Sequence, residues 1–374
     1  MSVVPHPSST PHSSVPRASI PDEDPWQVTA HAMPKVLLHE HLDGGLRVAT
    51  LLELLERQGL DSPAHDVAGL TAWFEDRAHA GSLEEYLRGF PLTVAAMASP
   101  DALERVAFEA AEDARLDGCI LAEFRIAPLL FEPLGVPPDA VVEALLSGLS
   151  RSGLPSGLIV CAMRHHADEE IARSAELAMR WHRKRTRGAD VVGFDLAGPE
   201  AGWPASRHAQ LLQHVCAAGL GLTLHAGEAD EGLRVLEALR LGATRIGHGI
   251  RLVDLLQGPQ SREVLAELHT RGGHLEVCPT SNVQTGGAVS LRTHPIRALW
   301  QAGVSLSFHT DNRLMSCVSH SGEALALVRE LEFSWSDLVH MGLMAAQSSF
   351  MEARWREGAQ AALRAWRPPP QGRA

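Results

Sequence analysis

Short apolar runs alternate with stretches of helical spacing along most of this chain. The runs are rich in valine, isoleucine and leucine, as buried strands are, and the stretches between them repeat apolar residues every three or four positions. Eight such runs occur, at residues 36–38, 119–125, 158–163, 191–195, 222–225, 245–248, 275–278 and 304–308. Strands that alternate with helices predict parallel β-α-β units, and eight of these units predict an α/β fold, the closed (β/α)8 TIM barrel.

An open, doubly wound parallel sheet is the alternative to a closed barrel. Its dinucleotide-binding version would show a GxGxxG motif after the first strand, and none follows residues 36–38. The pattern also predicts extra helices, both in a long insertion after the first strand and at the C-terminal end. The inserted helices are expected at Leu46–Leu60, Leu70–Ala78, Ser82–Ala98 and Pro100–Leu116, and the C-terminal ones run to about Ala365.

The two ends of the chain differ in composition from the region between them. Residues 1–25 are rich in proline, serine and histidine, and residues 367–374 include three consecutive prolines. Segments of this kind bury too little apolar surface to fold. We therefore expect disordered tails at 1–25 and 367–374 on either side of a single barrel domain at 26–366.

Composition and charge narrow the classes of partner. The 374 residues are 45% hydrophobic and 21% charged, with a net charge of −12, and the pI is near 5.9. This is an ordinary globular mixture. An acidic chain without a basic stripe is a poor partner for nucleic acid or for an anionic membrane surface. We therefore expect a small-molecule partner, whereas the composition says nothing about oligomeric state.

Cysteine usage and the N-terminus bear on location. The five cysteines are scattered without CxxC spacing, which favours a reducing compartment over a disulfide framework. The N-terminus lacks the apolar segment of a signal peptide, and no run approaches the length of a membrane span. These features predict a cytoplasmic protein.

Polar groups stand where the predicted strands end. His39 and His41 follow the first strand two residues apart, so both side chains point to one face. Imidazole is a good ligand for zinc. Other strand ends carry Asp43, Asp195, Glu200, His225, Glu228, His248, His309, Asp311 and Asn312. Because the carboxyl ends of barrel strands meet at one face, these groups predict a catalytic metal that keeps a position open for water.

Six motifs in this set resemble those of the adenosine deaminase family of zinc hydrolases. They lie in the family's order within residues 35–316, and helical segments continue the match to about residue 350. They are LLHEHLDGGLR, VVGFDLAGPEAG, LHAGE, RIGHG, EVCPTSN and SFHTDN. Each motif alone is unspecific, but the ordered combination is characteristic.

The resemblance implies a role for each matching residue. One Zn²⁺ per chain would be held by His39, His41, His225 and Asp311. Glu228 would donate a proton to purine N1, and His248 would orient the attacking water. Contacts to the substrate would come from His41, Asp43, Gly198 and Asn312. The implied reaction is hydrolytic deamination of adenosine, and of 2′-deoxyadenosine, in purine salvage.

The physical chemistry is consistent with these implied roles. Aromatic C6 is a poor electrophile, and a proton delivered to N1 by a carboxylic acid makes it reactive. A metal-activated water is a nucleophile at neutral pH. Asp43 would contact ribose and Gly198 would offer its backbone amide to N3, since a glycine lets a flat base approach the backbone.

Structural roles compete with several of these assignments. Asp43 could cap the helix expected near Leu46, Gly198 could serve only a turn, and His248 could be a neutral core group. We expect His165 and His166 to support the site or lie on the surface. On the second strand, Glu123 and Arg125 alternate, which predicts an interior polar pair.

Two positions depart from the more familiar family motif. His309 stands where asparagine is common, and its spacing from Asp311 predicts an inward-facing side chain that packs inside the barrel. Asn312 stands where aspartate is common, beside purine N7. An amide and a carboxyl offer different protons, so the change bears on base selectivity.

Four other functions remain as alternatives. Within the family, the substrate could be free adenine or a modified adenine nucleoside, although Asp43 favours a ribosyl group. A binuclear amidohydrolase would need a bridging lysine near the fourth strand, where residues 194–196 offer none. A nucleic-acid base deaminase would need a PCxxC motif, but Cys278 has no second cysteine nearby. An extracellular growth-factor-like relative is disfavoured by the missing signal peptide.

Overall fold

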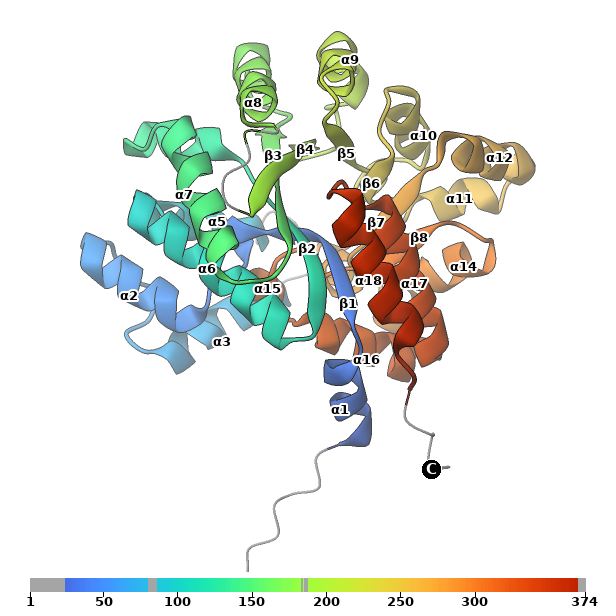
Figure 1. The fold of residues 1–374 in the computed structure, drawn as a ribbon, viewed down its shortest axis with the longest axis horizontal. Coiled ribbons are helices and arrows are strands. Elements are labelled where there is room, and N and C mark those ends of the chain that lie inside the picture. The colour runs from blue at the N-terminus through green and yellow to red at the C-terminus, as the bar shows by residue number, and fades with distance from the viewer. Residues whose placement is uncertain (1–23, 80–85, 183, 185–187, 369–374) are drawn as a thin grey trace, which may run out of the picture.

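Eight parallel strands form one sheet in the order β1 to β8, and helices surround it (Figure 1). The computed structural model describes residues 24–79, 86–182, 184 and 188–368. The strands are β1 Lys35–His41, β2 Cys119–Ile126, β3 Ser156–Met163, β4 Ala189–Ala197, β5 Gly221–Ala226, β6 Arg245–His248, β7 His274–Val277 and β8 Leu306–Phe308. The predicted (β/α)8 barrel is confirmed.

The barrel closes where the end of β8 returns to β1. Glu40 and Asp311 form a parallel bridge. The backbone N–H of His41 donates to the carbonyl of Asp311 at 2.7 Å, and that of Asp311 donates to the carbonyl of His39 at 3.0 Å. The seam of the barrel therefore brings together two segments that carry predicted site residues.

The insertion between β1 and β2 is helical, as predicted. It comprises η1 Leu42–Gly44, α2 Val48–Gln58, α3 Val67–Ala78, α5 Phe90–Ala96 and α6 Pro100–Leu116. Local capping explains two of the starts, because the side chain of Asp66 accepts from Gly69 N and that of Ser99 accepts from Ala102 N. The predicted helix start at Ser82 lies outside the described residues, and the described helix of that segment begins at Phe90.

The remaining helices lie around the sheet and beyond it (Figure 1). Those that follow β2 to β7 are η2 Pro128–Leu134, α7 Pro138–Arg151, α8 Asp168–Trp181, η3 Ala205–His208, α9 Ala209–Ala217, α10 Leu233–Arg240, α11 Leu252–Leu256, α12 Ser261–Arg271, α13 Pro279–Gln284, η4 Leu291–Thr293 and α14 Ile296–Gln301. After β8 come α15 Arg313–Ser316, α16 His320–Leu331, α17 Trp335–Ser348 and α18 Ala353–Ala365. The predicted C-terminal helices thus include α17 and α18, which pack against β1 and β2 respectively.

The helix that precedes the barrel was not predicted, and neither were the short helices α11 and α13. Helix α1, Pro25–Ala32, begins at the last residue assigned to the N-terminal tail, and the side chain of Asp24 caps it. Lys35 is buried and donates to the carbonyls of Ala30 and Met33 at the other end of α1. Residues 1–23 and 369–374, which hold most of the two predicted tails, lie outside the described part. Among the described helices, none is long and apolar enough to cross a membrane.

Charged side chains fill the barrel interior beneath the strand ends. Arg125 donates to Asp195 at 2.7 Å and to Glu276 at 2.6 Å, while Arg245 pairs with Glu123 and Glu276. All five residues have no exposed surface. The prediction that Glu123 and Arg125 pair with each other is therefore wrong. Glu123 pairs with Arg245, and Arg125 pairs with Asp195 and Glu276.

Candidate active site

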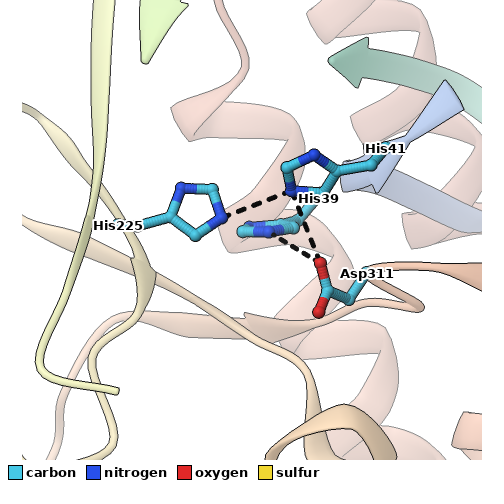
Figure 2. A group of neighbouring side chains, drawn as sticks. All are labelled: His39, His41, His225 and Asp311. Atoms are coloured by element: carbon cyan, nitrogen blue, oxygen red, sulfur yellow. Dashed lines mark hydrogen bonds and ion pairs between the residues drawn. The ribbon is translucent and has the colours of Figure 1, made fainter. Parts of the chain in front are cut away.

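Four side chains from three strand ends converge at the carboxyl end of the barrel (Figure 2). His39 and His41 come from β1, His225 from β5, and Asp311 from the turn after β8. One nitrogen or oxygen of each lies within 4.8 Å of the others. Nε2 of His41 is 3.3 Å from Nε2 of His225, and Oδ1 of Asp311 is 3.3 Å from Nε2 of His39 and 3.5 Å from Nε2 of His41.

These distances fit a set of ligands that would hold one metal ion. Bonds of about 2.0–2.1 Å to nitrogen and oxygen place neighbouring ligand atoms about 3–3.5 Å apart. Nε2 of His39 is buried and has no hydrogen-bond partner among the described residues. Burial also lowers the pKa of His41 well below its usual value, so this ring is in the neutral form that ligates metals. The donor set and the unpartnered nitrogen both suit a bound cation.

Buried carboxylates orient two of the histidines. Nδ1 of His39 donates to Glu276 at 2.8 Å, and Nδ1 of His225 donates to Asp195 at 2.9 Å. Burial alone would raise the pKa of Glu276, but Arg125 and the second interior arginine hold it well below its usual value. With their Nδ1 atoms engaged, both rings present Nε2 to the cluster, as histidines at metal sites do.

A cavity of about 510 Å³ opens beside this cluster. The predicted site residues that line it are His41, Asp43, Gly198, His225, Glu228, His248, Asp311 and Asn312. His39 belongs to the cluster but does not line the cavity. The structure therefore brings every residue to which the resemblance assigns a role to one place.

Asp43 lies in η1 and faces the cavity. Helix α2 begins at Val48 with Arg47 at its N-cap position, so Asp43 does not cap it, contrary to the structural alternative. Its Oδ1 is buried without a hydrogen-bond partner among the described residues. Burial, followed by the charge of Asp311, raises the pKa of Asp43 to about 7. An unpaired buried carboxyl oxygen is ready to accept from a ligand hydroxyl.

Gly198 has a backbone conformation that favours glycine, and the ring of His165 lies close to it at the cavity wall. Its φ of 87° lies in the left-handed region, and a Cβ there would lie 3.0 Å from Nδ1 of His165. A side chain would be strained by the backbone and crowded by that ring. His165 and His166 both line the cavity, and Nδ1 of His166 contacts Glu170 at 2.8 Å.

The two residues that depart from the motif have different environments. Asn312 lines the cavity, and a Cβ on Gly44 would lie 2.1 Å from its Oδ1, so the absence of that Cβ makes room for the amide. His309 instead packs inside the barrel, as expected. Its Nδ1 accepts from Leu38 N at 3.2 Å, and its Nε2 contacts Ser307 Oγ at 2.7 Å.

Helix α13 and its C-cap residue Thr285 supply contacts that the sequence did not predict. Asn282 lies 3.0 Å from Nδ1 of His248 and 3.5 Å from Oε1 of Glu228, and Thr285 Oγ1 donates to the same oxygen at 3.0 Å. Ser281 donates to Oδ2 of Asp311 at 2.6 Å. The only signal was the EVCPTSN motif itself, which marks this segment without assigning a role to its last two residues.

Glu200 holds the loop that carries Glu228. Its buried carboxylate accepts four consecutive backbone N–H groups, those of residues 227–230, at 2.5, 3.0, 2.9 and 3.2 Å. A carboxylate bound to this many amides is strongly oriented. Glu200 was predicted only as a strand-end acid, and this contact was not predicted because 27 residues separate it from the first of the four.

Comparisons with known proteins agree with this geometry. A model of the family described as adenosine deaminase matches residues 34–365. An adenosine deaminase of Mycobacterium tuberculosis is 42% identical over 344 residues, covering 87% of this chain and 92% of that protein. The structure of an adenine deaminase from Arthrobacter aurescens has a TM-score of 0.77 at 26% identity, covering 90% and 99%. An N6-methyl-AMP deaminase from Arabidopsis thaliana has a TM-score of 0.75 at 25% identity, covering 91% and 98%.

The matched region begins one residue before β1 and ends with the last residue of α18. It therefore holds all eight strands, the converging histidines and aspartate, and the cavity beside them. The 42% identical relative is matched along most of both chains. On these grounds the chain belongs to the adenosine deaminase family.

Proposed function

We propose that this enzyme catalyses the zinc-dependent hydrolytic deamination of adenosine, and of 2′-deoxyadenosine, to the corresponding inosine and ammonia, as a step of purine salvage. The observation that carries the proposal is the shared cavity. Three members of the metal-binding cluster and the carboxyl group of Glu228 line the same space of about 510 Å³. A nucleophile and an acid can therefore act on one bound base.

His39, His41, His225 and Asp311 would hold one Zn²⁺. A bound zinc ion supplies a Lewis acid that lowers the pKa of water to about 7. The chain contributes an oriented site, because Glu276 and Asp195 hold two of the histidine rings and Ser281 holds the aspartate. Such supporting contacts raise the basicity of the ligands and fix their direction.

Glu228 is suited to deliver a proton to N1 of the purine. Asn282 of α13 and Thr285 at its C-cap both bond to its Oε1, and Nε2 of His248 lies 3.5 Å from its Oε2. A positioned carboxylic acid commonly contributes about 10²–10⁴-fold to a reaction rate. Protonation at N1 makes C6 electrophilic, and His248 stands close enough to orient the attacking water.

The remaining contacts favour a nucleoside. The unpaired Oδ1 of Asp43 is an acceptor for a ribose hydroxyl, and Gly198 leaves its backbone open to the edge of a flat base. Asn312 stands where it can meet N7. The runner-up substrates are free adenine and a modified adenine nucleoside, and deaminases of adenine and of N6-methyl-AMP have similar structures.

A metal analysis and a substrate panel test the proposal together. Purified enzyme should contain one zinc per chain and convert adenosine faster than adenine or N6-methyl-AMP, as followed by ultraviolet absorbance. His41→Ala should lower metal content and activity in parallel. Full activity in a metal-free preparation would contradict the metal role. A preference for free adenine would contradict adenosine as the substrate.

Glu228→Gln separates the acid from the metal. The amide keeps the shape but has no proton of suitable acidity, so turnover should fall by about 10²-fold or more while zinc is retained. Turnover within about tenfold of the unaltered enzyme would exclude Glu228 as the acid.

The five cysteines are all free, and three of them are buried. This supports the proposed cytoplasmic location, since thiols stay reduced there.

A further inference from the structure

The position of the hydrogen on the His248 ring follows from a series of hydrogen bonds that begins at a backbone N–H group. The N–H of Ile296, at the start of α14, lies 3.1 Å from Nδ1 of His294. A backbone N–H can only donate, so Nδ1 of His294 must accept and carries no hydrogen. The ring is 3% exposed, and burial lowers its pKa to about 3. His294 is therefore neutral and carries its hydrogen on Nε2.

The amide of Asn282 takes its orientation from that hydrogen. Nε2 of His294 lies 3.3 Å from Oδ1 of Asn282 and donates to it. The NH2 end then faces Nδ1 of His248 at 3.0 Å and Oε1 of Glu228 at 3.5 Å. The reversed amide would set NH2 against the N–H of His294 and its oxygen against a carboxylate. One orientation satisfies all three neighbours, so the assignment does not depend on telling nitrogen from oxygen by position alone.

We propose that His294 and Asn282 are positioning residues that hold His248 in the neutral tautomer with its hydrogen on Nε2. Because Asn282 donates to Nδ1 of His248, Nδ1 is an acceptor and carries no hydrogen. The ring hydrogen is therefore on Nε2, which lies 3.5 Å from Oε2 of Glu228. His248 thus enters the reaction as a hydrogen-bond donor and not as a base.

Asn282 and Thr285, the C-cap residue of α13, distinguish the two oxygens of Glu228. Asn282 and Thr285 both donate to Oε1, which leaves Oε2 as the oxygen that carries the transferable proton. This part of the inference rests on the proposed function, in which Glu228 is the acid. The tautomer of His248 does not, because it follows from hydrogen bonds alone.

Nitrogen spectroscopy tests the tautomer directly. Zinc-loaded enzyme with ¹⁵N-labelled histidine should show, in a long-range ¹H–¹⁵N correlation spectrum, an unprotonated Nδ1 and a protonated Nε2 for His248. The signal missing from His248→Gln identifies the ring. His274, whose nitrogens contact the hydroxyls of Ser305 and Ser307, is an internal control that should not change in any variant below. A protonated Nδ1, or a mixture of tautomers, in the unaltered enzyme would overturn the proposal.

Asn282→Asp keeps the shape and reverses the polarity. The carboxylate should accept from His248, so Nδ1 should become protonated. Loss of one aimed donor in an active site lowers kcat by about 10²–10³-fold, and we expect a fall of that order with KM changing far less and zinc content unchanged. Loss of zinc together with kcat would place Asn282 in support of the metal and would overturn its assigned role.

Two substitutions of His294 test the hydrogen bond that this residue donates to Asn282. His294→Gln can still donate to Oδ1 of Asn282, and it should preserve both the His248 spectrum and kcat. His294→Leu cannot donate, and it should lose the single tautomer and much of kcat. Equal effects of the two substitutions would show that His294 only fills space. If the tautomer is as expected but adenosine is not deaminated, the proposed function fails and the network stands.

Discussion

Glu40 and Arg313 form an ion pair across the seam where the end of β8 meets β1, with Nε of Arg313 donating to Oε1 of Glu40 at 2.6 Å. The other carboxylate oxygen accepts from Thr310 at 2.9 Å. Glu40 is fully buried between the two histidines of β1, and Arg313 follows the aspartate of the cluster by two residues. The pair therefore ties together the segments that bear three of the four metal-binding side chains.

Arg313→Met should destabilise the fold and loosen the metal site. Removing one partner of a buried ion pair costs on the order of 3 kcal/mol because the other charge stays buried. Loss of a supporting contact lowers metal affinity by about 10–100-fold. Denaturant unfolding of the metal-free protein and chelator competition measure the two effects. The double variant Arg313→Met/Glu40→Leu should recover stability.

A surface pair provides the control for this substitution. Arg354 and Glu352 are 3.0 Å apart with exposed side chains. Arg354→Met should change the free energy of unfolding by no more than about 0.5 kcal/mol. Equal losses at the two sites would mean that the seam pair has no special importance.

Glu200→Gln should slow turnover without releasing zinc. The amide offers one acceptor oxygen to the four N–H groups of residues 227–230, so the loop that carries Glu228 becomes less fixed. Hydrogen bonds to a charged group contribute about 1.5–3 kcal/mol, which corresponds to a loss of about 10–150-fold in kcat.

A double variant checks that Glu200 acts through Glu228. Adding Glu200→Gln to Glu228→Gln should cause little further loss, because residues that act through one another are not additive. Additive losses would contradict the assigned path. Glu237→Gln, at a half-buried carboxylate on α10 that accepts from Ser206 N, is the control and should keep full turnover.

Asn312→Ala should affect adenosine and spare 7-deazaadenosine. Purine N7 is an unprotonated acceptor, and the amide of Asn312 can donate to it without any titration. A lost buried hydrogen bond costs about 1–3 kcal/mol, or about 5- to 150-fold in kcat/KM. The 7-deaza analogue lacks the acceptor. Equal losses on both substrates would show that Asn312 shapes the cavity without reading N7.

Gly44→Ala should produce part of the same effect. A Cβ at this position would lie 2.1 Å from Oδ1 of Asn312, so the amide must move. We expect kcat/KM for adenosine to fall by more than that for 7-deazaadenosine. Gly59→Ala is not a suitable control because its φ is 65°, whereas Gly358→Ala meets no atom within 4 Å on α18 and should be silent.

Acid should destabilise the metal-free protein partly through His274. Burial lowers the pKa of His274 to about 3; the charge of Arg245 lowers it further, and the charge of Glu276 acts in the opposite direction. The unfolded chain binds a proton below about pH 6.5 while the folded one does not, so stability is present above pH 6.5 and declines toward pH 3. The decline is at most about 2 kcal/mol between pH 6.5 and 5.

His274→Gln should make the urea unfolding free energy less dependent on pH in this range. Metal-free protein is used so that zinc release does not contribute. An unchanged pH dependence would mean that the buried ring gains its proton as readily as in the unfolded chain.

The alternation of apolar runs and helical stretches was enough to predict the barrel and its extra helices. Both follow from local periodicity, and the carboxyl ends of parallel strands must share one face. That rule also placed the histidines of β1 beside His225 and Asp311, which the structure brings within 4.8 Å of one another. Helix α1 was missed because the composition around Pro25 is that of a tail, and its stability comes from packing on α16 and from Lys35 at its C-terminal carbonyls.

The sequence by itself thus determined the fold class and which side chains meet at the strand ends. Tertiary structure alone decided their partners: Glu200 with the loop of Glu228, His294 with Asn282, Glu40 with Arg313, and Arg125 with Asp195 instead of Glu123. Periodicity specifies the direction of a side chain but not its distance to a group far away in the chain. A hydrogen bond depends on a few tenths of an ångström and on which atom holds the proton, and only the packed barrel sets both.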